Sequence, residues 1–165
     1  MGKTIKIIYG SSTGNTRRAA ETIAARLGAA TVINVAEAGP DDFKADLLIL
    51  GTSTWGCGEL QDDWQNALPM LESADLSGTP VALFGLGDSV GFSDTFVNGM
   101  AEIADKAVAA GGRLIGKWSS ETYSHTGSTA EENGFFVGLA LDEDNEPGET
   151  DGRINQWCAR LADEL

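Results

Sequence analysis

The sequence predicts an α/β protein whose three layers are built on a doubly wound, five-stranded parallel sheet. Short apolar runs alternate with longer amphipathic segments along the chain, which is the pattern of strands joined by crossover helices. The run from Leu47 to Leu50 is apolar at every position, as expected of a strand buried on both faces. A length of 165 residues suits one domain, residues 1–165.

The first half of the chain predicts three strands and two helices. An apolar run predicts the first strand at residues 5–9, and small or apolar side chains at helical spacing predict a helix at 16–27, before Gly28 as C-cap. A second strand is expected at 31–35, a short helical turn at 40–43, a third strand at 46–51 and a short helix at 64–71.

The second half predicts two more strands, of which the last is interrupted by an insertion. The fourth strand is expected at 81–85, followed by a long helix at 95–110 that two glycines end. The fifth strand begins at 113–118, gives way to the polar stretch 119–133 and resumes at 135–141, before a closing helix at 150–165. In doubly wound folds, ligands bind beyond the carboxyl ends of the strands, where the strand order reverses. The loops after strands one, three and four are therefore the candidate site.

The loop after the first strand has the composition of a phosphate site. Its hydroxyl, amide and glycine residues are Ser11, Ser12, Thr13, Gly14, Asn15 and Thr16. Backbone N–H groups at a helix start, with the positive helix end, attract an anion, and neutral hydroxyls suit a monophosphate. The loop lacks the Gly-Lys-Ser/Thr of a triphosphate loop and the GxGxxG of a dinucleotide fold. The alternative is a plain helix N-cap.

The loops after strands three and four each carry an aromatic residue among small ones. The first holds Thr52, Ser53, Thr54, Trp55, Gly56, Cys57 and Gly58, and the second holds Gly85, Leu86, Gly87, Asp88 and Phe92. Trp55 is placed to stack on a flat ring, with Phe92 on the opposite face, unless Trp55 merely covers a helix end. The glycines allow close backbone approach, and Asp88 either accepts from a ring N–H or caps a turn.

With these three loops, the sequence resembles the flavodoxins over nearly its whole length. The run 11–16 resembles their phosphate loop, 54–64 the loop of their first stacking aromatic, and 84–88 the start of the loop carrying the second. The interrupted fifth strand and the run 136–145 resemble the long-chain subgroup, especially bacterial flavodoxins associated with nitrogen fixation. One departure is Phe92, where the family usually has Tyr, so a phenol hydrogen bond is lost while stacking is expected to survive.

The resemblance implies noncovalently bound flavin mononucleotide (FMN) that cycles mainly between semiquinone and hydroquinone, in an electron carrier with no catalytic residue. The Gly56 carbonyl is expected to turn toward the flavin N5–H after the first reduction, since glycine makes a peptide flip easy. One alternative is an FMN-dependent quinone or NAD(P)H oxidoreductase of similar fold. A signalling receiver domain is another, but the first loop lacks the clustered acids that it needs.

The net charge of −14 favours basic protein partners and argues against nucleic acid and anionic membranes. The resemblance suggests nitrogenase iron protein, ferredoxin/flavodoxin–NADP reductase or pyruvate:flavodoxin oxidoreductase as transient partners of a monomer. The acidic run 59–63 is a candidate docking rim, or else a solvated helix start where acids suit the dipole. The role of the insertion 119–133 stays open.

The cysteines and the ends of the chain predict a cytoplasmic protein without a metal site. Cys57 and Cys158 lie far apart in no metal-binding spacing, and Cys158 is expected in the core. The first residues run straight into a strand, and no segment approaches the roughly 20 apolar residues of a membrane span. The single histidine, His125, is expected at the surface with no role.

Overall fold

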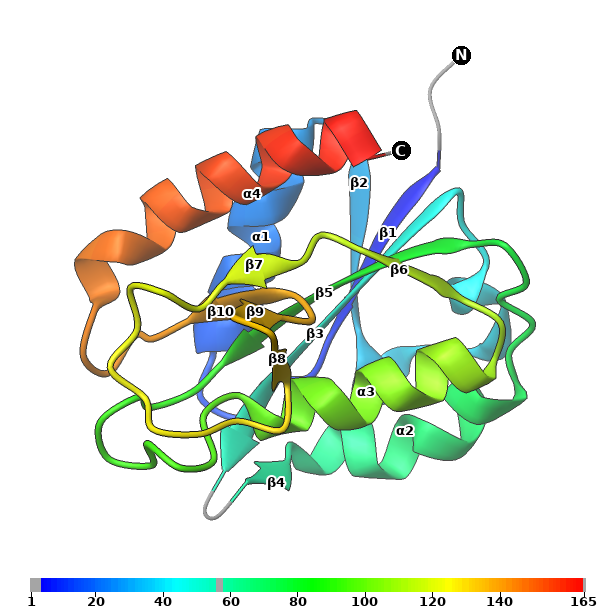
Figure 1. Cartoon of the computed structure of the whole chain (residues 1–165). Helices are drawn as coiled ribbons and strands as arrows, with labels where there is room; N and C mark the ends of the chain where they lie inside the picture. The colour runs from blue at the N-terminus through cyan, green and yellow to red at the C-terminus, as the bar shows by residue number, and fades with distance from the viewer. Residues whose placement is uncertain (1–3, 56–57, 165) are drawn as a thin grey trace.

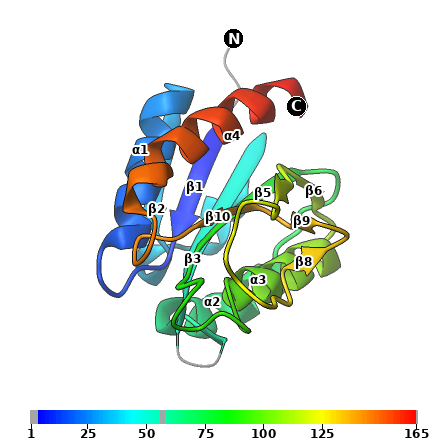
Figure 2. The same ribbon diagram turned by 60° about the vertical axis from the view of Figure 1, so that its left-hand side comes forward.

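The computed structural model describes residues 4–55 and 58–164, and its central sheet lies between two helical layers (Figures 1 and 2). The main-sheet strands are β1 Ile5–Tyr9, β2 Ala30–Asn34, β3 Leu47–Trp55, β5 Pro80–Leu86, β6 Arg113–Ile115 and β10 Leu139–Leu141, and the short β4 Glu59–Leu60 pairs with β3. The helices are α1 Asn15–Leu27, α2 Asp62–Ser73, α3 Asn98–Ala109 and α4 Thr150–Glu164, with short 3-10 turns at Val35–Glu37, Pro40–Phe43 and Pro147–Glu149. The predicted three-layer α/β fold is confirmed.

The strand order places a switch point between β1 and β3. The sheet runs β2-β1-β3-β5, with β10 and β6 on the far side of β5, and these pairs are parallel. Helices α1 and α4 contact each other on one face, and α2 and α3 do so on the other. Parallel strands have their carboxyl ends at one edge, so the loops after β1, β3, β5 and β10 meet there.

The interruption of the fifth strand is confirmed, but its boundaries were wrong. Strand β6 pairs with the first half of β5, and β10 pairs with the second half. Trp118 leaves the main sheet and pairs with Phe136 in a small antiparallel sheet of β7 Trp118–Ser119, β9 Phe135–Phe136 and β8 Glu131–Glu132. The predicted strand 135–141 is thus two strands in different sheets. Gly138 lies between them, where a Cβ atom would come within 2.1 Å of the Leu83 carbonyl oxygen.

The long helix begins three residues later than its pattern predicts. Val97 adopts a left-handed φ of 50°, so the helix cannot extend back through residues 95–97. The amide of Phe96 instead donates to the Gly127 carbonyl, which anchors the insertion to this turn.

The core explains most of the remaining apolar pattern. The four residues of the run from Leu47 to Leu50 are fully buried, and so are Trp64 and Trp157. Cys158 is buried as expected, and burial raises the pKa of its thiol to about 11. The expectation for His125 was wrong, because its ring packs against Phe96 and Phe136 and its Nε2 lies 2.7 Å from a Glu131 carboxylate oxygen. Within the described residues, no helix is long and apolar enough to cross a membrane.

The close packing of Gly138 predicts that the stability of the fold depends strongly on side-chain size at this position. We expect Gly138→Ala to lower the free energy of unfolding by about 2–3 kcal/mol, because the added methyl group meets backbone atoms that cannot rotate away. The control is Gly152→Ala in α4, where a Cβ meets nothing within 4 Å. That change should raise the free energy of unfolding by about 0.5–1 kcal/mol. Urea unfolding measures both, and equal effects would contradict the prediction.

Candidate functional site

A cavity of about 340 Å³ opens at the carboxyl edge of the sheet, where four loops meet. Its lining residues are Thr13 from the loop after β1, Asn15 and Thr16 at the start of α1, Ser53, Thr54 and Trp55 at the end of β3, Leu86 at the end of β5, Gly87, Asp88 and Phe92 from the loop after β5, and Glu143 and Asp144 from the loop after β10. The cavity therefore lies beside the switch point, where the fold class places a ligand.

The start of α1 supplies the anion-binding part of this cavity. Gly14 takes a left-handed φ of 94° before the helix, and its amide donates to Ser11 Oγ at 3.0 Å. Among the described residues, no side chain caps this helix start, and its first turn has no acidic residue. The N–H groups of the first turn therefore have no intrahelical partner, and the positive helix end is uncompensated.

Two partly exposed aromatic side chains flank the same cavity. Trp55 is 40% exposed and Phe92 is 46% exposed, although large aromatic side chains are stabilised by burial away from water. The Trp55 indole is held by its Nε1–H, which donates to Ser53 Oγ at 2.9 Å. The expectation that Trp55 lies in a loop was wrong, because it is the last residue of β3 and pairs with Glu59 of β4. The arrangement suits a flat ring inserted between aromatic faces.

Asp88 caps the turn that carries Phe92. Its Oδ1 accepts from the amide of Gly91 at 2.6 Å, from the amide of Val90 at 3.1 Å and from Asn145 Nδ2 at 2.7 Å. The Asn145 hydrogen bond, followed by that of Gly91, lowers the pKa of Asp88 below its ordinary value. Of the two roles expected for this carboxylate, the turn cap is the one that these contacts display.

Sequence reasoning missed the acidic loop after β10. Glu143 and Asp144 line the cavity, and the buried carboxylate of Asp142 holds their loop by accepting from the amides of Ser89 and Asn145. Burial, followed by the neighbouring charges of Asp88, Asp142 and Glu143, raises the pKa of Asp144. The switch-point argument applies to every strand of the sheet, so extending it to the fifth strand would have found this loop.

Several expected site residues do not line the cavity, and two lie outside the described residues. Thr52 is fully buried, and its hydroxyl donates to the Ser53 carbonyl. A Cβ on Gly85 would come within 3.2 Å of Met100, so this glycine serves packing against α3. Ser11, Ser12 and Gly14 belong to the loop before α1 but are not among the lining residues. Gly56 and Cys57 lie outside the described residues.

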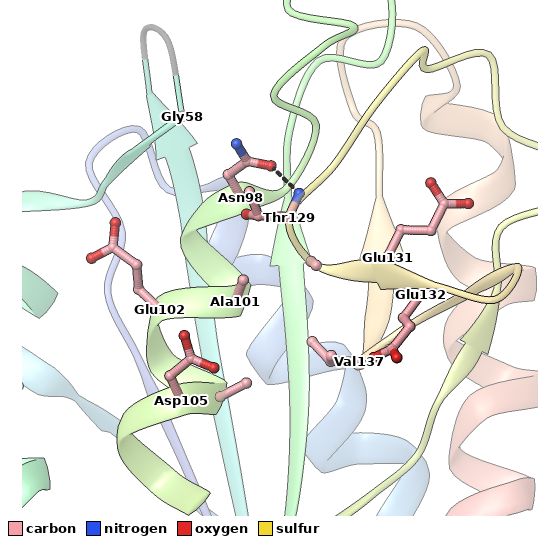
Figure 3. A pocket seen from close by; sticks show the side chains of 11 residues that line it. Gly58, Asn98, Ala101, Glu102, Asp105, Thr129, Glu131, Glu132 and Val137 are labelled. Atoms are coloured by element: carbon pink, nitrogen blue, oxygen red, sulfur yellow. Dashed lines mark hydrogen bonds between the residues drawn. The ribbon is translucent and has the colours of Figure 1, made fainter. Parts of the chain in front are cut away.

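Gly58 lines a different and larger cavity. This space of about 550 Å³ lies between α3 and the small sheet, where Asn98 Oδ1 accepts from the amide of Thr129 at 2.8 Å (Figure 3). Its polar lining is acidic, with Glu102, Asp105, Glu131 and Glu132, and its described lining includes neither an aromatic nor a basic side chain. The smaller cavity has two aromatic side chains and the uncapped start of α1, so a planar ligand with an anionic group fits it better, despite its size.

Comparison with known proteins agrees with this geometry. Residues 7–157 match the family model described as flavodoxin. The chain belongs to the flavodoxin family. It is 41% identical to a flavodoxin of Nostoc sp. over 168 residues, covering 100% of this chain and 99% of that one. It is 40% identical to a flavodoxin of Picosynechococcus sp. over 161 residues, covering 95% of each.

A solved structure extends the similarity to three dimensions. The Fusobacterium nucleatum flavodoxin, crystallised bound to flavin mononucleotide, is 34% identical to this chain. The two superpose with a TM-score of 0.94 over 99% of each chain. The flavodoxin fold of this chain thus includes the insertion within the fifth strand.

The crowding around Asp144 predicts a pH-dependent effect on stability. A carboxyl group whose pKa is raised by folding destabilises the folded state once it ionises, and this loss grows as pH rises from its ordinary pKa of 3.8 through the folded value. We expect Asp144→Asn to raise the melting temperature of the FMN-free protein by about 1–2 °C at pH 7. The gain should vanish near pH 3. A calorimetric gain of the same size at both pH values would contradict this cause.

Proposed function

We propose that this flavodoxin is a low-potential one-electron carrier that holds FMN noncovalently in the 340 Å³ cavity and is not an enzyme. The observation that carries the proposal is the uncapped start of α1, which opens into a cavity flanked by two exposed aromatic residues. One end of that cavity suits a monophosphate and the other a planar ring. The F. nucleatum flavodoxin of nearly the same fold binds flavin mononucleotide.

The residues present fit each part of FMN. The first-turn amides of α1 and the hydroxyls of Thr13 and Thr16, which both line the cavity, would hold the phosphate without a charged side chain. Trp55 and Phe92 would stack on the two faces of the ring, with Ser53, Thr54 and residues 86–88 along its edges. When bound, the flavin supplies the one-electron chemistry. The backbone turn expected at Gly56 lies outside the described residues.

The acidic side chains beside the ring would keep its potential low. Asp88, Glu143 and Asp144 all line the cavity, and their negative charges would oppose the addition of an electron that makes the ring negative. One carboxylate about 12 Å away, at an effective dielectric of about 20, opposes that electron by roughly 1.4 kcal/mol. This corresponds to about 60 mV for a one-electron couple. Partial desolvation between two aromatic faces acts in the same direction.

We further propose a cytoplasmic, monomeric, long-chain flavodoxin with basic redox partners. The net charge of −14, with Glu59 of β4 and Asp62 at the start of α2 both exposed, would steer a basic surface to the end of β3 that carries Trp55. Nitrogenase iron protein is the favoured acceptor, because the run 136–145 resembles flavodoxins of nitrogen fixation. The insertion between β6 and β10 supports the long-chain assignment.

The first test is uptake of FMN by the purified chain. We expect FMN-free protein to bind FMN tightly and to quench its fluorescence. Trp55→Ala and Phe92→Ala should each weaken binding by about 10-fold, since each removes one stacking face. The control is Phe135→Ala in the small sheet, an exposed aromatic residue outside the cavity lining. Protein that stays colourless in excess FMN would disprove the cofactor assignment.

The second test concerns the partner. In stopped-flow measurements, reduced protein should transfer electrons to nitrogenase iron protein, with a rate that falls steeply as salt rises. Glu59→Gln in β4 should lower the rate at low salt by about 2- to 5-fold, while Asp163→Asn near the C-terminal end of α4 should leave it unchanged. Faster transfer to ferredoxin–NADP reductase than to the iron protein would favour the other class of partner.

A further inference from the structure

Gln61 connects the loop before α1 to the start of α2, two segments far apart in sequence. It is only 2% exposed and is the N-cap of α2. Its side-chain oxygen accepts from the amide of Trp64 at 3.2 Å. Its Nε2 donates to Ser12 Oγ at 3.3 Å and to a carboxylate oxygen of Asp63 at 3.0 Å. A buried amide therefore contacts the phosphate loop from outside the cavity.

The partners of Gln61 leave one orientation for its amide group. A backbone N–H such as that of Trp64 only donates, so it must face the side-chain oxygen. The contact of Gln61 with an Asp63 carboxylate oxygen then comes from the side-chain nitrogen, which donates to it. The two N–H bonds of Gln61 are then both used, one on Asp63 and one on Ser12. Ser12 Oγ is thereby an acceptor turned toward α2, consistent with its absence from the cavity lining.

The position of Gln61 is also fixed by close packing. A Cβ on Gly10 would lie 2.3 Å from Gln61 Oε1 and 2.6 Å from Trp64 Cδ1, so a larger residue cannot occupy position 10 in this arrangement. The Trp64 indole is itself anchored, because its Nε1–H donates to the Gly51 carbonyl at 2.7 Å. Gln61 is thus a rigid support, and Ser12 is the point where the exposed loop is tied to it.

We propose that Gln61 is a positioning residue for the cofactor phosphate. By holding Ser12, it keeps the amides of the loop before α1 directed at one point, although neither side chain lines the cavity. The loop ordering is then already present before the anion arrives, so less conformational entropy is lost on binding. The inference rests on the proposed function, since it concerns how FMN is held.

The test compares FMN with riboflavin, which has the same ring but no phosphate. The measured quantity is the ratio of the two affinities, because damage to the fold or to the ring site lowers both affinities together. We expect Ser12→Ala and Gln61→Met each to lower this ratio by about 3- to 10-fold, the loss expected for one hydrogen bond. The double variant should lower it no further than either single change, because both remove the same contact.

The matched control is Gln65→Met. Gln65 lies on the same helix, and its Nε2 donates to the Leu60 carbonyl at 2.7 Å, so it supports β4 without touching the phosphate loop. This variant should leave the affinity ratio unchanged. An unchanged ratio in Ser12→Ala, multiplied effects in the double variant, or an equal fall in Gln65→Met would each overturn the inference. Wild-type protein that binds neither ligand would overturn the proposed function, and the inference with it.

Discussion

The candidate site depends on one electrostatic feature, the helix start of α1 that no described side chain caps. Most helix starts satisfy their free N–H groups with a Ser, Thr or Asp side chain. Here Gly14 takes the capping position in a left-handed conformation, and the first turn has no acidic residue. The free donors face a cavity at the carboxyl edge of the sheet. In the proposed function a phosphate would satisfy them, and FMN binding would supply the cap that this helix start lacks.

In the proposed function, the groups that would hold the cofactor differ from those that would lower its potential. The expected phosphate contacts are neutral, whereas the carboxylates of Asp88, Glu143 and Asp144 line the cavity. Neutral donors bind an anion without offsetting the negative field at the ring. Asn145 fixes the positions of these acids, because it donates to both Asp88 and Asp142 and so connects the loop after β5 to the loop after β10. Placement of the acids and of Phe92 is therefore coupled.

Much of the fold followed from local pattern, and the errors have physical causes. The apolar run of β3 was predicted because burial on both faces leaves little choice of residue, whereas the continuation of this strand through residues 52–55 was wrongly expected to be loop. The run 135–141 looked continuous because its apolar pattern does not change, yet Gly138 lies where it passes from one sheet to the other. The start of α3 was misplaced since Val97 adopts a conformation that its residue type disfavours.

The sequence by itself determined the fold class, the family resemblance, the loop from Ser11 to Thr16 and the two aromatic residues, because each is carried by residues close together in the chain. Only the tertiary structure decided which of them line one cavity, and that Glu143 and Asp144 join them. The same holds for the contact between Gln61 and Ser12, which lie 49 residues apart. Such contacts arise from the packing of whole helices and strands, and the spacing of residues along the chain does not predict them.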